Sequence, residues 1–114
     1  MEVSHERFEA LVAEALDLIP DELADAIDNL AVFVVDRSPT DPELLGLYDG
    51  IPLTDREHYG GMIMPDRISI YRLAICDICD DEDEIVEQVR ITVIHEVAHH
   101  FGIDDDRLEE LGWD

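Results

Sequence analysis

A long segment near the carboxyl end, residues 84–101, constrains the fold more than any other part of the chain. Its apolar residues recur at helical spacing and fall on one broad arc, which comprises Val86, Val89, Val93, Ile94, Val97, Ala98 and Phe101. A helix with such an arc must bury it, and we expect the arc to face a β-sheet. The acidic run at 80–84 favours a helix start, and Gly102 favours a helix end.

The rest of the 114-residue chain predicts a small α+β domain. Residues 5–19 show helical spacing with Ser4 as a candidate N-cap, and Pro20 ends that helix. The other expected elements are a short helix at 21–28, strands at 30–36 and 67–75, a short strand within 43–54 with a turn at Asp49 and Gly50, and a final helix at 105–112. Residues 58–66 are expected to be irregular. No domain boundary is evident, so residues 1–114 are predicted to form one domain.

Polar residues gather on the long helix opposite the apolar arc. Gln88, Thr92, His95 and His99 fall within a stripe about 60° wide. Residues one turn apart have Cβ atoms about 5–6 Å apart, so His95 and His99 can direct ring nitrogens at one metal ion. Glu96 is turned about 100° from His95, too far to join the ligands easily. It can still reach a water molecule, which makes it a candidate general base.

A catalytic zinc ion normally takes three protein ligands, so the sequence must supply one more. Gly102 permits a left-handed turn that sends the chain back toward the metal, and Asp105 follows three residues later. Asp104 and Asp106 flank Asp105 and are alternatives to it. Asp104 is also a candidate N-cap of the final helix.

The completed pattern HExxHxxGxxD, at His95, Glu96, His99, Gly102 and Asp105, resembles the metzincin-type zincins in the variant with Asp as third ligand. The chain looks most like the small bacterial minimal zincin metallopeptidase-like family. This resemblance implies an α+β, minimal zincin-like fold, with a small mixed β-sheet packed on an N-terminal helix and a long C-terminal active-site helix. It also implies Zn2+ on His95, His99 and Asp105, with Glu96 as the catalytic base.

We therefore expect a zinc-dependent hydrolase of peptide or related amide bonds. Zinc would polarise the scissile carbonyl and acidify water, while Glu96 would carry the proton to the leaving amine. A peptide or protein substrate would lie in an extended form along an edge strand, and residues 60–72 are the candidate wall. Tyr48, Tyr59 and Tyr71 are candidates for stabilising the oxyanion, but packing in the core or at the rim of the site is the favoured explanation for each.

Two other functions stay open. The chain is short for a peptidase with a separate substrate-binding subdomain, which favours a metal-stabilised binding or regulatory module. The second is a metal-dependent RNase, because one bacterial endoribonuclease family has a similar HxxxH helix. That family, however, has His at the position of Asp105. The formal net charge of −23, from 30 acidic and 7 basic residues, also argues against nucleic acid or anionic membranes as partners and favours a monomer. The sequence also leaves open whether the bound metal is zinc or another divalent ion.

The remaining features have simpler readings. The first twenty residues lack the pattern of a signal peptide, and no apolar run reaches the roughly 18 residues of a membrane span, so a cytoplasmic location is expected. Cys76 and Cys79 form a lone CxxC, which we expect to be two reduced cysteines at a strand end. His100 points about 100° from His99 and is expected to be a surface residue or a neighbour of the site. His5 and His58 are distant in sequence and receive no role.

Overall fold

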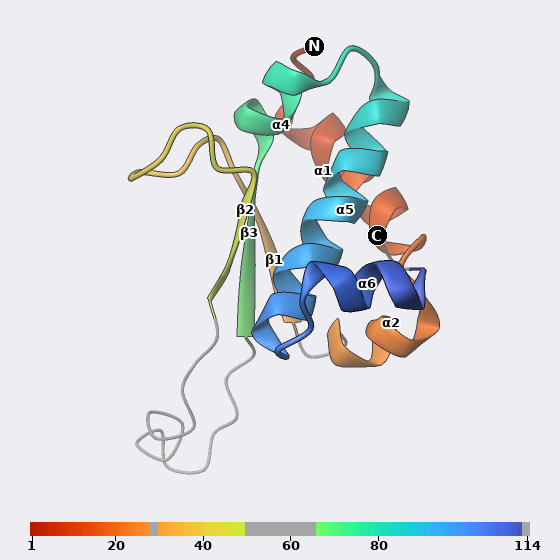
Figure 1. Cartoon of the computed structure of the whole chain (residues 1–114). Helices are drawn as coiled ribbons and strands as arrows, with labels where there is room; N and C mark the ends of the chain where they lie inside the picture. Colours follow the sequence, from red (N-terminus) through yellow and green to blue (C-terminus); the bar gives the residue numbers. More distant parts are fainter. Residues whose placement is uncertain (28–29, 50–65, 113–114) are drawn as a thin grey trace.

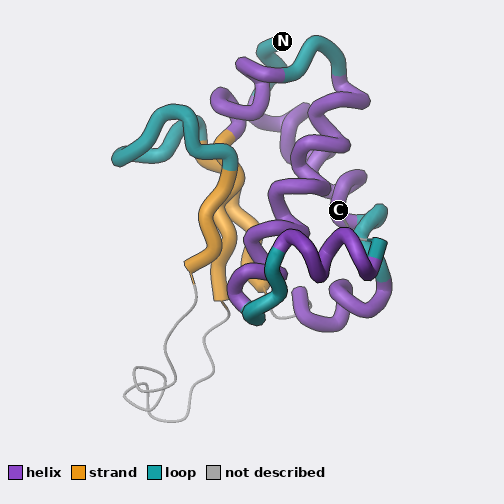
Figure 2. The backbone as a smooth tube through the Cα atoms, in the orientation of Figure 1, coloured by secondary structure: helices purple, strands orange, loops and turns teal. Residues whose placement is uncertain are grey.

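The computed structural model describes residues 1–27, 30–49 and 66–112. Its helices are α1 (His5–Leu16), α2 (Asp21–Ile27), α4 (Arg72–Ile78), α5 (Glu82–His100) and α6 (Asp105–Leu111), and its strands are β1 (Leu30–Val35), β2 (Gly46–Asp49) and β3 (Asp66–Tyr71). The strands form a sheet in the order β1-β3-β2, with β1 parallel and β2 antiparallel to β3. The helices gather on one side of this sheet (Figures 1 and 2). The predicted α+β fold with a small mixed sheet is confirmed.

Helix α5 forms the centre of the fold and contacts α1, α2, α4, β2 and β3. The predicted apolar arc is buried, except that Phe101 is 54% exposed. Phe101 is the C-cap residue and leaves helical geometry with φ −89° and ψ 10°, so the helical phase of the arc does not extend to it. We expected the apolar arc of α5 to face the sheet. Helix α5 also packs on α1, so that prediction was incomplete.

The helix starts follow the sequence signals. Ser4 accepts a hydrogen bond from the Arg7 N–H at 3.1 Å, and Asp81 accepts one from the Glu84 N–H at 2.8 Å. These side chains satisfy backbone donors that have no partner within the helix. Helix α1 ends at Leu16, earlier than the predicted end at residue 19. The Leu18 and Ile19 N–H groups bond three residues back, to Ala15 O and Leu16 O, so the chain tightens into a turn before Pro20.

The predicted strand at 67–75 was wrong in its second half. Strand β3 ends at Tyr71, and Arg72 starts helix α4. The alternating pattern stops there, and the following apolar run is buried as one turn of helix through Ala74, Ile75 and Cys76. A short apolar run does not distinguish strand from helix by periodicity alone.

Cys76 and Cys79 are therefore not at a strand end but in α4 and at its C-cap. Both are free and buried. Burial raises the pKa of the Cys79 thiol, with Glu84 and Cys76 adding to the effect. A raised pKa disfavours the thiolate, the reactive form of cysteine. These cysteines belong to the core.

Parts of the earlier expectations fall outside the described residues: Gly50 of the predicted turn, residues 58–65 of the predicted irregular segment, and with them His58 and Tyr59. Within the described ranges, no helix combines the length and the apolar character needed to cross a membrane.

Candidate metal centre

The two histidines of the motif lie one turn apart near the carboxyl end of α5. The ring centroids of His95 and His99 are 5.9 Å apart, with the ring planes inclined by 31°. His95 is half-buried, whereas the His99 side chain is 52% exposed. The predicted pair is thus adjacent and open to solvent on one side.

The turn after α5 brings Asp105 to His99. Gly102 adopts φ +77°, and two hydrogen bonds close the helix end, from Gly102 N–H to His99 O at 3.1 Å and from Ile103 N–H to Ala98 O at 2.8 Å. These are the bonds of a Schellman motif, which requires a residue that tolerates a left-handed backbone. Asp105 Oδ1 consequently lies 3.1 Å from His99 Nε2.

These three side chains fit a zinc ion in their chemistry, because imidazole nitrogen and carboxylate oxygen are both common zinc ligands. The His99–Asp105 pair is already in contact, and His95 is one helical turn away. Across residues 1–27, 30–49 and 66–112, however, no three His, Cys, Asp or Glu side chains converge closely enough to hold a metal ion. The assignment of His95, His99 and Asp105 as ligands stays a prediction.

The neighbours of Asp105 have other roles. The Asp104 side chain accepts a hydrogen bond from the Arg107 N–H at 2.9 Å and caps α6, which confirms that alternative for Asp104. Asp106 is exposed in the first turn of α6. Of the three aspartates, Asp105 is the one whose carboxylate contacts a histidine of the motif, His99, within the described part of the chain.

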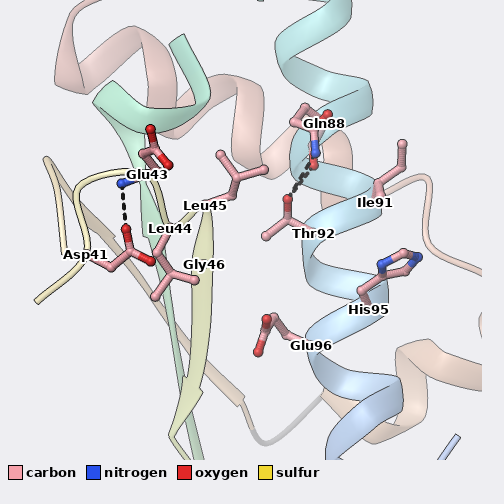
Figure 3. Close-up of a pocket in the computed structure, with 10 residues that line it drawn as sticks. All are labelled: Asp41, Glu43, Leu44, Leu45, Gly46, Gln88, Ile91, Thr92, His95 and Glu96. Atoms are coloured by element: carbon pink, nitrogen blue, oxygen red, sulfur yellow. Dashed lines mark hydrogen bonds between the residues drawn. The ribbon is translucent and has the colours of Figure 1, made fainter. Parts of the chain in front are cut away.

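Glu96 points toward the sheet. Its carboxylate Oε2 accepts a hydrogen bond from the backbone N–H of Tyr48 in β2 at 3.2 Å. Figure 3 shows the Glu96 carboxylate and the His95 ring leaving α5 on different sides, with Glu96 directed at β2. This arrangement agrees with the angular separation expected from the sequence and places Glu96 beside a strand.

Among the strands that the structure describes, β2 is an edge of the sheet. Tyr71 N–H donates to Leu45 O at 2.9 Å, and Leu47 is the register partner of Ser69. The backbone N–H and C=O groups of Leu45 and Leu47 therefore point toward β3. Tyr48 instead directs its N–H away from β3, as does Gly46 by the two-residue alternation of a strand. The prediction that residues 60–72 form the edge strand along which a substrate lies was wrong for the described residues 66–72. Strand β3 lies between β1 and β2 and has no free edge. Residues 60–65 of that wall lie outside the described ranges.

Gly46 lies beside the candidate site and was not predicted from the sequence. A Cβ atom added there would lie 2.6 Å from Thr92 Cγ2 and 3.2 Å from Ser69 O. Only glycine lets β2 approach α5 this closely, and that approach brings the Tyr48 N–H to Glu96. A glycine inside a short strand is a recognised signal of close backbone approach.

A second cluster holds β2 at the carboxyl end of α5. The Tyr48 ring stacks on His100 with centroids 4.1 Å apart, and the Tyr48 hydroxyl donates to Asp66 Oδ2 at 2.7 Å. His100 is thus a neighbour of the site through Tyr48. Tyr71 is buried in the core, and His5 pairs with Glu9 on α1, away from the motif.

A groove of about 340 Å³ opens between β2 and α5 next to Glu96 (Figure 3). We call it the β2–α5 groove, and it is lined by Asp41, Glu43, Leu44, Leu45, Gly46, Gln88, Ile91, Thr92, His95 and Glu96. His95 and Glu96 of the motif therefore share one concave surface with β2, whereas His99, Gly102 and Asp105 line a separate depression.

Comparison with known proteins decides the family. A family profile described as zincin-like metallopeptidase matches residues 27–113, which is more than half of the chain and includes the whole motif. The chain belongs to the zincin-like metallopeptidase family. No curated protein matches this zincin-like chain.

Among solved structures, the zincin-like chain is similar to a conserved hypothetical protein from Thermo thermophilus. The two share 19% sequence identity with a TM-score of 0.56, and the match covers 97% of this chain and 100% of that chain. At this identity, the similarity supports the fold and carries no functional information.

Proposed function

We propose that this zincin-like protein hydrolyses peptide bonds, with His95, His99 and Asp105 as ligands of a divalent metal and Glu96 as general base. The observation that carries the proposal is the contact between His99 Nε2 and Asp105 Oδ1 across the Gly102 turn. It supports a ligand set drawn from α5 and from the start of α6. Zinc bound there would supply Lewis acidity that polarises a carbonyl and acidifies water.

Glu96 performs the proton transfers in this proposal. Its carboxylate accepts a proton from the attacking water and delivers it to the leaving amine. The Tyr48 N–H fixes one carboxylate oxygen at 3.2 Å and leaves the other free to act as the base. Because the donor is a backbone group on a packed strand, the orientation of Glu96 does not depend on a mobile side chain.

The exposed edge of β2 supplies a place for the substrate. An extended peptide can pair with the backbone groups of Gly46 and with the Tyr48 carbonyl, which face away from β3, while the Tyr48 N–H stays bonded to Glu96. Main-chain pairing of this kind is a common mode of peptide recognition. Such a peptide would run past Glu96 and along the β2–α5 groove. A peptide or protein substrate is therefore the partner that we propose.

Metal analysis of the purified protein tests the ligand set. We expect about one zinc ion per chain in the wild-type protein and in Glu96→Gln, and loss of the metal in Asp105→Ala. Glu96→Gln should cleave none of the peptides in a mixed peptide library that the zinc-loaded wild type cleaves. Wild-type protein that neither carries nor takes up a metal ion would end the proposal, and so would full cleavage by Glu96→Gln.

One observation favours a second function. The proposed ligands lie on two helices, so a metal ion would link α5 to α6 whether or not catalysis follows. In a metal-stabilised binding module, chelation would lower the melting temperature strongly while the zinc-loaded protein cleaves nothing in the same library. Library cleavage that is lost in Glu96→Gln would favour the peptidase function over the binding module.

A further inference from the structure

The β2–α5 groove combines apolar walls with acidic groups. Leu44 and Leu45 line it on the side of the sheet, and Ile91 lines it on the side of α5, all three half-buried. At its base, the glycine at position 46 packs closely on Thr92 and presents no side chain. This shape accommodates an unbranched alkyl stem, of the kind that lysine and arginine bury along apolar surfaces.

The acidic groups of the groove have no cationic partner among the described residues. Asp41 Oδ1 accepts a hydrogen bond from the Glu43 N–H at 3.0 Å, and Glu96 accepts one from the backbone of β2. The arginines of the described ranges pair elsewhere: Arg7 with Glu82, Arg37 with Asp77, Arg67 with Asp49, Arg72 with Asp36, Arg90 with Glu87 and Arg107 with Glu110. Within the described chain, no ion pair therefore neutralises the carboxylates of the groove. The arginine nearest in sequence to Asp41 and Glu43, Arg37, donates to the Pro42 carbonyl at 3.1 Å and not to a groove carboxylate.

Other depressions on the described surface differ in this respect. The one beside α4 is lined by Arg37 as well as by Glu43 and Asp77, so it contains a cationic side chain, which pairs with Asp77. The one between α1 and β1 contains a single carboxylate, Glu9, which pairs with His5. A concave site lined by one sign of charge and by apolar walls concentrates counter-ions. Among these depressions, the β2–α5 groove has that combination. A further acidic depression, lined by His99, Gly102, Ile103, Asp104 and Asp105, has one large apolar side chain, Ile103, and belongs to the candidate metal centre.

We propose that the β2–α5 groove binds a lysine or arginine side chain of a peptide paired with β2, and that Asp41 and Glu43 determine this specificity. The proposal rests on the proposed peptidase function, because it places the peptide on the strand edge beside Glu96. Side chains of an extended peptide alternate between its two faces, so one of them can enter the groove while the backbone pairs with β2.

Binding of a matched peptide pair to the full chain, loaded with zinc, tests the proposal. The probes are a capped peptide with arginine flanked by three alanines on each side and the same peptide with neutral citrulline. Backbone amide shifts of the 15N-labelled protein report binding at about 0.15 M ionic strength. We expect saturable shifts for residues 41–46 and 88–96, and an affinity about tenfold higher for the arginine peptide than for the citrulline peptide.

Two double variants separate the groove from general electrostatic attraction. Asp41→Asn with Glu43→Gln removes two charges but keeps an oxygen that can accept the Glu43 N–H bond. Glu14→Gln with Asp17→Asn removes two exposed charges from α1 and its C-cap. We expect the arginine preference to disappear in the first variant and to persist in the second. Equal affinities for the two peptides in the wild type, equal losses in both variants, or no saturable shifts at all would overturn the proposal.

Mass spectrometry of the same samples, together with a mixed peptide library, distinguishes this proposal from the peptidase function. Library cleavage without preference for a basic residue would overturn the specificity of the groove and leave the hydrolase intact. Selective binding of the arginine peptide without any cleavage of the library would support the groove and count against the hydrolase.

Discussion

The backbone N–H of Tyr48 in β2 donates a hydrogen bond to the carboxylate of Glu96 in α5, with 3.2 Å between nitrogen and oxygen. The two residues are far apart in the chain, and β2 reaches α5 only because Gly46 permits close packing on Thr92. The candidate general base is therefore positioned by a strand and not by its own helix. The Tyr48 ring strengthens this junction by stacking on His100, four residues after Glu96.

Gly46→Ala should destabilise the protein by about 1–3 kcal/mol, because the added methyl group would lie 2.6 Å from Thr92 Cγ2 and the packed junction has no room for it. Chemical denaturation measures this cost. Thr92→Ser removes the clashing methyl group and keeps the hydroxyl that donates to Gln88 O at 2.7 Å. In the Thr92→Ser background, Gly46→Ala should cost less. An equal cost in both backgrounds would show that the contact with Thr92 is unimportant.

Gly102→Ala and Gly112→Ala form a matched pair at two helix ends. Both glycines have a positive φ, of 77° and 75°, and no atom of the described residues lies within 4 Å of a Cβ added at either one. Each substitution should cost about 1–2 kcal/mol through backbone strain alone. Only Gly102 directs the chain to Asp105, so only Gly102→Ala should also weaken zinc binding, as titration with a competing chelator would measure. Similar zinc affinities in the two variants would contradict this role for the turn.

Asp104 and Asp105 are adjacent but should behave differently. Asp104→Ala removes the N-cap of α6 and should cost about 1 kcal/mol of stability while leaving zinc binding nearly unchanged. Asp105→Ala should weaken zinc binding by more than the roughly 10–100-fold that loss of an outer hydrogen-bond partner costs. Calorimetric titration with zinc and thermal melting measure both effects. Strong binding by Asp105→Ala would remove Asp105 from the ligand set.

The ion pair between Arg7 in α1 and Glu82 in α5 should make stability depend on pH. Hydrogen bonds from Arg7 hold the pKa of the Glu82 carboxyl below its ordinary 4.5. A carboxyl with a lowered pKa in the folded state stabilises that state above its ordinary pKa and loses the contribution as pH falls through the lowered value.

We therefore expect Arg7→Gln to be less stable than the wild type near neutral pH. The difference should shrink as pH falls below 4.5, when urea denaturation is followed across that range. Arg107→Gln removes the same charge from α6 and serves as the control for net charge. A difference between Arg7→Gln and wild type that stays constant at acid pH would contradict the role of the pair.

Much of the candidate site could be predicted from the sequence because its signals are local. His95 and His99 are adjacent through the pitch of one helix, and Gly102 and Asp104 act on the helix ends beside them. The caps at Ser4 and Asp81 were predictable for the same reason. Helical spacing and capping depend on neighbours within four residues, so the sequence alone specifies them.

Other features depended on contacts between distant segments. The end of β3 at Tyr71 and the helical form of the next turn follow from burial of Ala74 and Ile75 in the core, which overrides a short apolar pattern. The strand order placed β3 in the centre and left β2 as an edge among the described strands, so the substrate wall that we propose lies along β2.

The sequence by itself thus determined the motif helix, its caps and the turn that returns Asp105 to His99. The tertiary structure decided which strand faces Glu96, why position 46 must be glycine, and where an acidic groove opens. The physical reason is that helix periodicity and capping are set by neighbouring residues, whereas strand order and close packing depend on which distant surfaces bury each other.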